Sequence, residues 1–246
     1  MTHLKNLKAV LITLFLTGIT IVSFAQITAG GRIGANFANL SGKSIQNSSM
    51  IVGYNIGGFA NYSLEDLITS DFGKIISVQV EFALEQKGAT TDYLFYSDSI
   101  GSPIYTDTGA KQVSTYMTIP VLAKFTFGDP KALQYFGEAG FYAAALSGLT
   151  INGEKWRDDD HNTATDKRKY RDEYSGFDYG FIIGGGASMP FGGRRSPWRA
   201  YANLRYAMGF SNIGELKEKT IDIPEGQLED IKTNTISLLL GVSYSF

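Results

Sequence analysis

Hydrophobic and polar residues alternate along the last fourteen residues of the chain, 233–246. Every second residue from Ile236 to Phe246 is apolar or aromatic, whereas the intervening residues are small or polar, apart from Leu239. A period of two is the period of a β-strand, and about 9–11 tilted residues suffice for a strand to cross a bilayer. The segment therefore predicts a strand that is long enough to span a membrane.

The same alternation recurs upstream and predicts an all-β fold. In the clearest case, Val78, Val80 and Phe82 alternate with the polar residues Gln79 and Glu81. Pro120 lies inside another segment, where it predicts a bulge or a missing ladder contact. The eight predicted strands cover about 26–40, 51–63, 75–87, 113–127, 133–147, 176–189, 198–210 and 233–246.

The connections between these strands differ in length at the two ends of the sheet. Those after the second, fourth and sixth strands are 64–74, 128–132 and 190–197, whereas those after the odd-numbered strands are 41–50, 88–112, 148–175 and 211–232. Long loops at one end and short turns at the other are typical of an outer-membrane barrel. The pattern therefore predicts an eight-stranded, antiparallel, up-and-down transmembrane β-barrel. A barrel of eight strands has room only for side chains, so no open pore is expected.

Alternation alone does not say which face points outward. A soluble lipocalin-like barrel, with its apolar face around a ligand, is the alternative. A soluble surface usually carries about 25–35% charged residues, whereas the polar faces here are mostly Gly, Ser, Asn and Thr with a few charges of both signs. Charges of both signs suit an interior where they pair. We therefore predict an interior charge network formed by Arg32, Glu81, Glu85, Lys124, Glu138, Asp178, Arg199 and Arg205.

The aromatic residues also favour a bilayer. Five of them lie near the short-turn ends of their strands, where an interfacial girdle is expected; they are Tyr62, Phe127, Trp198, Tyr244 and Phe246.

The first 25 residues have the pattern of a cleaved signal peptide. Lys5 and Lys8 precede an apolar run over 9–22, and Ser23-Phe24-Ala25 is a small-x-small cleavage pattern. Residues 26–246 then form the barrel domain, and cleavage takes the net charge from −2 to −4. This charge gives no reason to expect nucleic acid as a partner, and the absence of Cys excludes a disulfide framework.

No pattern in the chain indicates catalysis or a cofactor. The only histidines are His3 and His161, and a nucleophile elbow of the Gly-x-Ser-x-Gly type is missing. Residues 158–161, Asp-Asp-Asp-His, could bind a divalent cation, but the flanking charges of both signs favour a solvated loop. The triple glycine 184–186 lacks a nucleotide fingerprint and is better explained by close approach of strands or side chains.

The loop 148–175 is the candidate contact element, because an exposed tryptophan between cations is a common interface anchor. The binding candidates in this loop are Trp156, Arg157, Asp158, Lys167, Arg168 and Tyr170.

Several motifs, taken in order, resemble those of the PorT family of outer-membrane β-barrels from Bacteroidota-type bacteria. They are Gly-Arg-Ile-Gly-Ala-Asn at 31–36, Leu-Glu-Gln-Lys-Gly at 84–88, Tyr-Met-Thr-Ile-Pro at 116–120, Gly-Glu-Ala-Gly at 137–140 and Arg-Tyr-Ala-Met-Gly-Phe-Ser-Asn-Ile at 205–213. The resemblance implies a location in the cell outer membrane and assembly through the terminal Phe246. Thr118 stands where an acidic residue is common in the family, so the resemblance does not support an ion pair at that level.

The sequence thus predicts a non-enzymatic outer-membrane barrel that acts through its extracellular loops in binding, adhesion or envelope integrity. Its expected partners are outer-membrane lipid and either envelope or secretion proteins or an extracellular ligand. The resemblance implies a second hypothesis, an accessory role in type IX-like protein secretion. The soluble lipocalin-like barrel remains the third.

Overall fold

A computed structural model describes residues 27–42, 45–97, 102–156, 175–193, 196–214 and 231–246. The predicted signal peptide therefore lies outside the described residues. Among the described residues, none belongs to a helix long and apolar enough to cross a membrane. The strands are β1 (Ile27–Ser41), β2 (Ile45–Ser63), β3 (Ile76–Ser97), β4 (Ser102–Phe127), β5 (Gln134–Ile151), β6 (Glu154–Trp156), β7 (Phe177–Pro190), β8 (Trp198–Gly209) and β9 (Lys232–Ser245).

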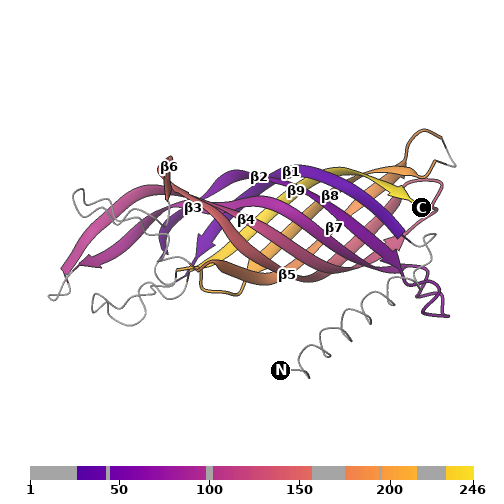
Figure 1. Cartoon of the computed structure of the whole chain (residues 1–246), viewed down its shortest axis with the longest axis horizontal. Helices are drawn as coiled ribbons and strands as arrows, with labels where there is room; N and C mark the ends of the chain where they lie inside the picture. Colours follow the sequence, from indigo (N-terminus) through magenta and orange to yellow (C-terminus); the bar gives the residue numbers. More distant parts are fainter. Residues whose placement is uncertain (1–26, 43–44, 98–101, 157–174, 194–195, 215–230) are drawn as a thin grey trace, which may run out of the picture.

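Eight of these strands close into an antiparallel barrel, as predicted (Figure 1). Each strand pairs with its neighbour in the order β4-β3-β2-β1-β9-β8-β7-β5, and β4 pairs with β5 to complete the circle. The first and last strands of the chain, β1 and β9, pair in continuous register from Thr28↔Ser245 to Ser41↔Lys232. Closure matters because an open sheet edge would leave unpaired backbone groups in lipid.

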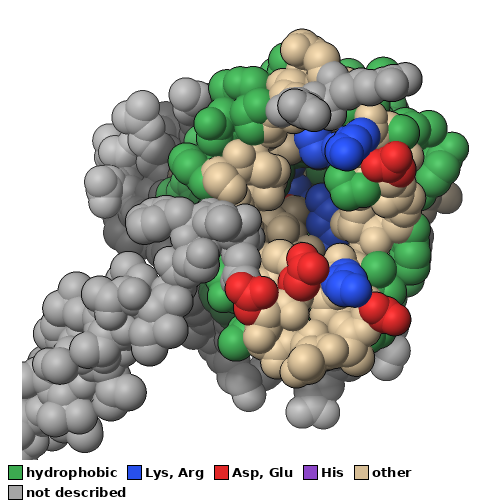
Figure 2. All heavy atoms as spheres, turned by 90° about the vertical axis from the view of Figure 1, so that its right-hand side faces the viewer, with side chains coloured by type: hydrophobic (Ala, Val, Ile, Leu, Met, Phe, Trp, Pro, Cys, Tyr) green, Lys and Arg blue, Asp and Glu red, His purple; other side chains and the backbone are tan. Residues whose placement is uncertain are grey.

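The two faces of the barrel wall are opposite in character. Outward-facing Ile33, Val52 and Leu240 are 58–68% exposed, whereas inward-facing Asn36 and Asp178 have no exposed surface. Viewed from the short-turn end, hydrophobic side chains ring the outside, and Lys and Arg side chains lie within a central hollow (Figure 2). This arrangement is the reverse of a lipocalin-like barrel, which has an apolar interior.

The expectation of a loop over 88–112 is wrong. β3 and β4 continue as a ladder from Gly88↔Val113 to Ser97↔Ser102, and this hairpin extends beyond the rest of the barrel at the end opposite the C-terminus (Figure 1). Strict alternation of polar and apolar residues stops near Lys87, because beyond it neither face has to meet lipid. The segment still contains many strand formers, with four Thr, three Tyr, two Ile and one Phe among its 25 residues.

The start of the predicted loop 148–175 also forms a hairpin. β5 runs to Ile151 and turns into β6, with Ile151 opposite Glu154. Asn152 and Gly153 have φ angles of 51° and 84°, the left-handed conformation that a two-residue hairpin turn requires. The predicted loop 41–50 is shortened in the same way, because β2 begins at Ile45.

Pro120 interrupts pairing without a bulge. β4 pairs with β3 at Val80↔Val121 and at Ala83↔Thr118 in one unbroken register, with no pair between them. The register shifts of β4 lie elsewhere, between Thr115 and Tyr116 on the β5 side and opposite 91–96 on the β3 side. Of the two outcomes predicted for this proline, the missing ladder contact is the one observed.

Candidate functional site

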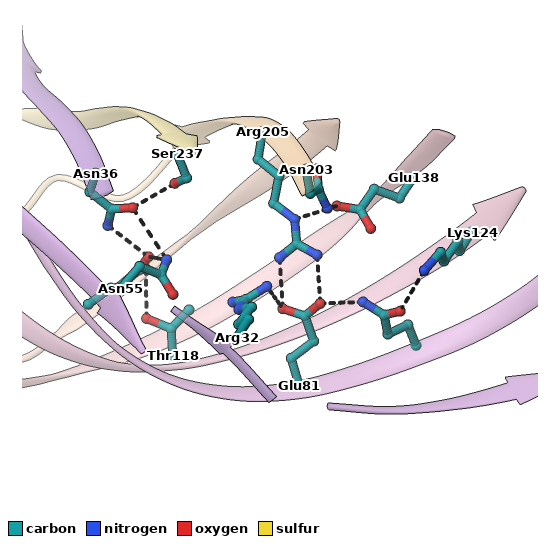
Figure 3. Close-up of polar contacts among 12 residues, drawn as sticks. Arg32, Asn36, Asn55, Glu81, Thr118, Lys124, Glu138, Asn203, Arg205 and Ser237 are labelled. Carbon is teal, nitrogen blue, oxygen red and sulfur yellow. Dashed lines mark hydrogen bonds and ion pairs between the residues drawn. The ribbon is translucent and has the colours of Figure 1, made fainter. Parts of the chain in front are cut away.

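The first group of interior charges, here called the arginine cluster, consists of Arg32, Glu81, Glu138 and Arg205 (Figure 3). The guanidinium group of Arg205 donates from both terminal nitrogens to the two oxygens of Glu81, at 2.8 and 2.7 Å. Its Nε donates to Glu138 Oε1, and Arg32 forms an ion pair with Glu81. Four strands, β1, β3, β5 and β8, are thus connected across the lumen.

Amide side chains hold the carboxylates of the arginine cluster in place. Asn203 Nδ2 donates to Glu138 Oε1 at 2.7 Å, and Gln79 Nε2 donates to Glu81 Oε1 at 2.5 Å. All four of these side chains are buried. Because buried charge is tolerated only when it is paired and hydrogen-bonded, the cluster works as one unit.

The second group, here called the lysine cluster, lies nearer the long-loop end and consists of Glu85, Lys87, Tyr142 and Asp178. Lys87 Nζ lies 3.2 Å from Glu85 Oε1 and 3.4 Å from Asp178 Oδ2, above the ring of Tyr142 at 4.0 Å from its centroid. Asp178 also accepts hydrogen bonds from three hydroxyl groups, those of Tyr142, Thr233 and Ser211.

Neutral side chains fill the level of Glu85. Thr118 Oγ1 donates to Glu85 Oε1 at 2.8 Å, and Asn55 Nδ2 donates to Glu85 Oε2 at 3.0 Å. The family resemblance gave no support for an ion pair at the level of Thr118, but the structure has one there, because Lys87 reaches Glu85. Lys87 was not among the residues predicted for the network, although its place on the charged face of strand 75–87 was a sufficient signal.

Two predicted network residues, Lys124 and Arg199, lie nearer the short turns and have no carboxylate partner within the described structure. Lys124 Nζ is 3.5 Å from Gln79 Oε1 and lies over the ring of Phe136, 4.1 Å from its centroid. Arg199 donates instead to the carbonyl groups of Pro130 and Ala132 and to Ser188.

The long-loop end of the lumen is closed by an apolar cap. Leu40, Ala89, Ile213 and Ile231 form one buried cluster, each at most 2% exposed. Two of these residues, Ile213 and Ile231, belong to the connection between β8 and β9, and they are linked by a backbone hydrogen bond of 2.8 Å. The cap therefore folds over the lysine cluster.

Aromatic residues mark both rims of the outer wall. At the short-turn rim, Phe191, Trp198, Tyr244 and Phe246 form a chain of ring contacts with centroid distances of 5.0–6.3 Å. At the other rim, Phe177, Tyr179 and Phe210 contact one another at 6.1 and 6.4 Å. Only the first girdle was predicted; the second could have been found by aligning outward-facing aromatics at the far strand ends.

The loop candidates are mostly beyond the described part of the chain. Trp156 is the last residue of β6, and its backbone pairs with that of Leu149. The other five candidates, together with the acidic segment 158–161, lie outside the described residues; the five are Arg157, Asp158, Lys167, Arg168 and Tyr170. Within the described residues, no group of three or more His, Cys, Asp or Glu side chains could hold a metal ion.

The fold and its interior are those of an outer-membrane β-barrel. The model of one family, described as outer membrane protein beta-barrel domain, matches residues 24–215. The chain therefore belongs to the outer membrane protein beta-barrel domain family, and it is located in the outer membrane, in contact with its lipid. The comparison with curated proteins returned no match.

Similar solved structures are also outer-membrane proteins. Neisserial surface protein A is 11% identical, with a TM-score of 0.46, over 89% of this chain and 97% of that chain. OprG from Pseudomonas aeruginosa is 10% identical, with a TM-score of 0.44, over 90% and 96%. Ail, the attachment invasion locus protein of Yersinia pestis, is 12% identical, with a TM-score of 0.38, over 89% and 99%.

Proposed function

We propose that the protein is a non-enzymatic surface-binding protein whose barrel serves as a membrane anchor for its extracellular segments. The observation that carries this proposal is the β3–β4 hairpin. β4 pairs with β5 only as far as Gln112↔Ile151, yet it begins ten residues earlier, at Ser102. At about 3.3 Å per residue this overhang past β5 is about 33 Å long. β2 supports β3 as far as Ile45↔Tyr93, and Tyr93 pairs with Asp107, so the five residues Ser102–Thr106, about 17 Å, project beyond both neighbouring strands. Ordering these residues costs conformational entropy, and we infer that the projection has a use.

The position of the hairpin supports an outward-facing role. In outer-membrane barrels the short turns face the periplasm and the longer connections face outside. The hairpin emerges at the end opposite the C-terminus (Figure 1). The cap lies at the same end, since Leu40 is near the end of β1 and Ile231 directly precedes β9. The paired strands of the hairpin are therefore available to ligands or cells outside, in binding, adhesion or maintenance of the envelope.

The filled lumen supports binding rather than transport. The arginine cluster, the lysine cluster and the cap follow one another along the axis. Each is made from side chains of several strands, and most of these side chains are less than 10% exposed. A solute pathway would require all three levels to rearrange together.

The carboxylates that an enzyme would need are engaged in ion pairs. Both oxygens of Glu81 accept from Arg205, and Glu85 is paired with Lys87. An acid or base acts only when it can exchange a proton with a substrate in a cleft. We therefore favour a structural role for Glu81, Glu85 and Glu138.

The test is a hairpin replacement that keeps the barrel register. Thr91 pairs with Ala110, so a two-residue Asn-Gly turn in place of 92–109 joins two residues that are already neighbours. Intact cells displaying either form are compared for adhesion to immobilised polysaccharides, glycoproteins and other bacterial cells. Adhesion should be lost with the shortened hairpin, while the unheated protein still migrates as a folded barrel on a detergent gel.

Two further variants separate the outer elements from the barrel as a whole. Replacing 152–172 by a short Gly-Ser turn, with Trp156→Ala as the single-residue version, tests the second outer element. Replacing 65–75 at the opposite end by Asn-Gly is the matched control, because Leu64 already bonds to Ile76 there at 3.1 Å. Equal adhesion by all forms would refute a surface-binding function.

If the protein is instead a PorT-family protein with a role in type IX-like secretion, different experimental results are expected. Deletion of the gene would then trap secreted cargo in the periplasm, and the protein would co-purify with other export proteins. Cells carrying the shortened hairpin should show neither effect if the protein acts by surface binding.

A further inference from the structure

The lumen has one closed end and one hollow end. The apolar cap of Leu40, Ala89, Ile213 and Ile231 closes the long-loop end. At the short-turn end, the space-filling view shows a central hollow with Lys and Arg side chains inside it (Figure 2). The hollow, here called the vestibule, faces the periplasm because the short turns do.

Positive charge is in excess around the vestibule. In the half of the lumen nearer the short turns, the described residues include four cations, Arg32, Lys124, Arg199 and Arg205, against the two carboxylates Glu81 and Glu138. The carboxylates of the turns themselves, Glu65, Asp66, Asp71 and Asp129, are exposed to water. An excess of two positive charges in a partly desolvated space favours a bound anion.

Lys124 is a cation with N–H donors to spare on the vestibule side of the arginine cluster. Its register partner in β5 is Glu138; the Oε1 atom of Glu138 accepts from Arg205 and Asn203, and its Oε2 atom has no hydrogen-bond partner among the described residues. An ammonium group has three N–H donors, and that of Lys124 has one acceptor, Gln79 Oε1, at 3.5 Å. The ring of Phe136 lies under the other side of the ammonium group, 4.1 Å from Nζ to the centroid.

Arg199 supplies charge from a fixed position. All three of its nitrogens donate to Ser188 or to turn carbonyl groups, with distances of 2.5–3.3 Å. Because its N–H donors are already used, Arg199 acts on a bound anion mainly through its positive charge. Tyr201, which packs against both Phe59 and Phe136 at 5.7 and 6.4 Å, forms an aromatic wall beside Lys124.

We propose that the vestibule binds a phosphate group from the periplasmic side, with Lys124 as its direct donor and Arg199 as the second source of positive charge. A phosphate monoester or inorganic phosphate carries about −1.5 to −2 charges at neutral pH, which matches the excess of two cations. Lysine binds phosphate as a point charge. The aromatic wall of Phe136, Tyr201 and Phe59 limits the site to a small group.

Binding is measured on the full mature chain in an uncharged detergent, by titration calorimetry at low salt. Inorganic phosphate and glycerol 3-phosphate are the two probes. Tighter binding of inorganic phosphate indicates a free anion as the ligand, and tighter binding of the ester indicates a phosphorylated solute. Wild-type protein should bind one phosphate group saturably.

The decisive variant is Lys124→Gln, with Lys131→Gln as the control at an exposed turn of the same barrel end. Loss of a charge-assisted hydrogen bond should weaken binding about tenfold or more in K124Q, whereas K131Q should bind like wild type. Folding of each variant is checked by the migration of unheated protein. Equal affinity in K124Q and wild type, or no saturable binding to wild type, would overturn the proposal.

A measurement on the wild-type chain covers the case in which K124Q does not fold. Acetic anhydride modifies accessible lysines, and mass spectrometry reports each of them separately. Phosphate should protect Lys124 and leave Lys131 unprotected. Equal modification of Lys124 with and without phosphate would contradict the site.

Discussion

Arg205 is the residue on which the interior charges depend most. It binds both oxygens of Glu81 and one of Glu138, and its side chain is 5% exposed. Bidentate contact fixes the relative positions of β3 and β8 as well as neutralising charge. Removing one partner of a buried ion pair usually costs more than forming the pair gains, because the remaining charge is left unpaired.

Replacing Arg205 by Met should therefore destabilise the barrel strongly. We expect the free energy of unfolding to fall by about 3–5 kcal/mol, measured by reversible urea unfolding in lipid vesicles with tryptophan fluorescence. The control is Lys74→Ala, which removes an exposed ion pair with Asp71 and should leave the unfolding midpoint unchanged. Equal midpoints for R205M and wild type would mean that the cluster does not stabilise the fold.

Gly186 makes room for an interior aromatic ring. A Cβ atom placed on it would lie 2.1 Å from the carbonyl oxygen of Ala202 and 2.7 Å from Cζ of Phe136. This is the close approach predicted for the triple glycine 184–186. Gly137, in the next strand and facing outward, has space, since its nearest atom would be 4.0 Å away.

Gly186→Ala should accordingly lower stability by about 1–3 kcal/mol, the usual cost of overpacking, whereas Gly137→Ala should change it by less than about 0.5 kcal/mol. The same urea titration compares the two alanine variants. A similar loss for both would show that glycine is needed for strand flexibility rather than for space.

At the scale of the element, β8 spans the bilayer between the two aromatic rims. From Trp198 to Phe210 there are twelve residue steps, or about 40 Å along the strand and about 28 Å along the axis at a tilt of about 45°. The apolar band of an outer-membrane barrel is about 25 Å tall. Leu204, midway between the rims and 58% exposed, therefore lies near the centre of the bilayer.

An arginine at position 204 should then destabilise the folded barrel. Leu204→Arg is expected to lower the free energy of unfolding by about 2–4 kcal/mol, and Tyr135→Arg, at the short-turn rim, by about 0–1 kcal/mol. Tyr135 is a suitable control because it is similarly exposed, at 61%. Equal costs at the two depths would be incompatible with the proposed position of the bilayer.

The sequence predicted the elements that meet lipid and missed those that do not. Alternation placed all eight barrel strands because hydrocarbon on one side forces a strict period of two. Beyond Lys87 that constraint ends, so the β3–β4 hairpin was interpreted as a loop. The Asn152-Gly153 turn was a local signal that was available but not used.

The alternation of polar and apolar residues could not predict which charged residues form ion pairs, for a different reason. The alternation placed the charged residues on the inward face, but Glu81 and Arg205 are 124 residues apart. Their contact depends on the stagger between strands around the closed barrel, which the alternation does not specify. Lys124 forms no ion pair within the described structure although Glu138 is its register partner, because Glu138 Oε1 accepts from Arg205 and Asn203.

At the scale of the whole molecule, the lumen is asymmetric along its axis. The vestibule half has an excess of positive charge, whereas the lysine cluster has one cation, Lys87, for two carboxylates, Glu85 and Asp178. Above them lies a cap without charge. The described part of the lumen is thus hollow at the short-turn end and packed with apolar side chains towards the long loops, which suits the proposed anchor with an extracellular hairpin.

Because the cap and the two charged clusters lie one after another along the lumen, the lumen should stay impermeable to small anions even when the cap is removed. We expect vesicles containing the wild-type protein to retain an entrapped small anion, because the cap, the lysine cluster and the arginine cluster block the lumen in series. A triple cap variant, Leu40→Ala, Ile213→Ala and Ile231→Ala, should also retain it, since both charged clusters remain beneath. An open porin in the same vesicles supplies the positive control for release. Leakage from wild-type vesicles would argue for a transport function, and leakage from the cap variant alone would make the cap the sole seal of the barrel.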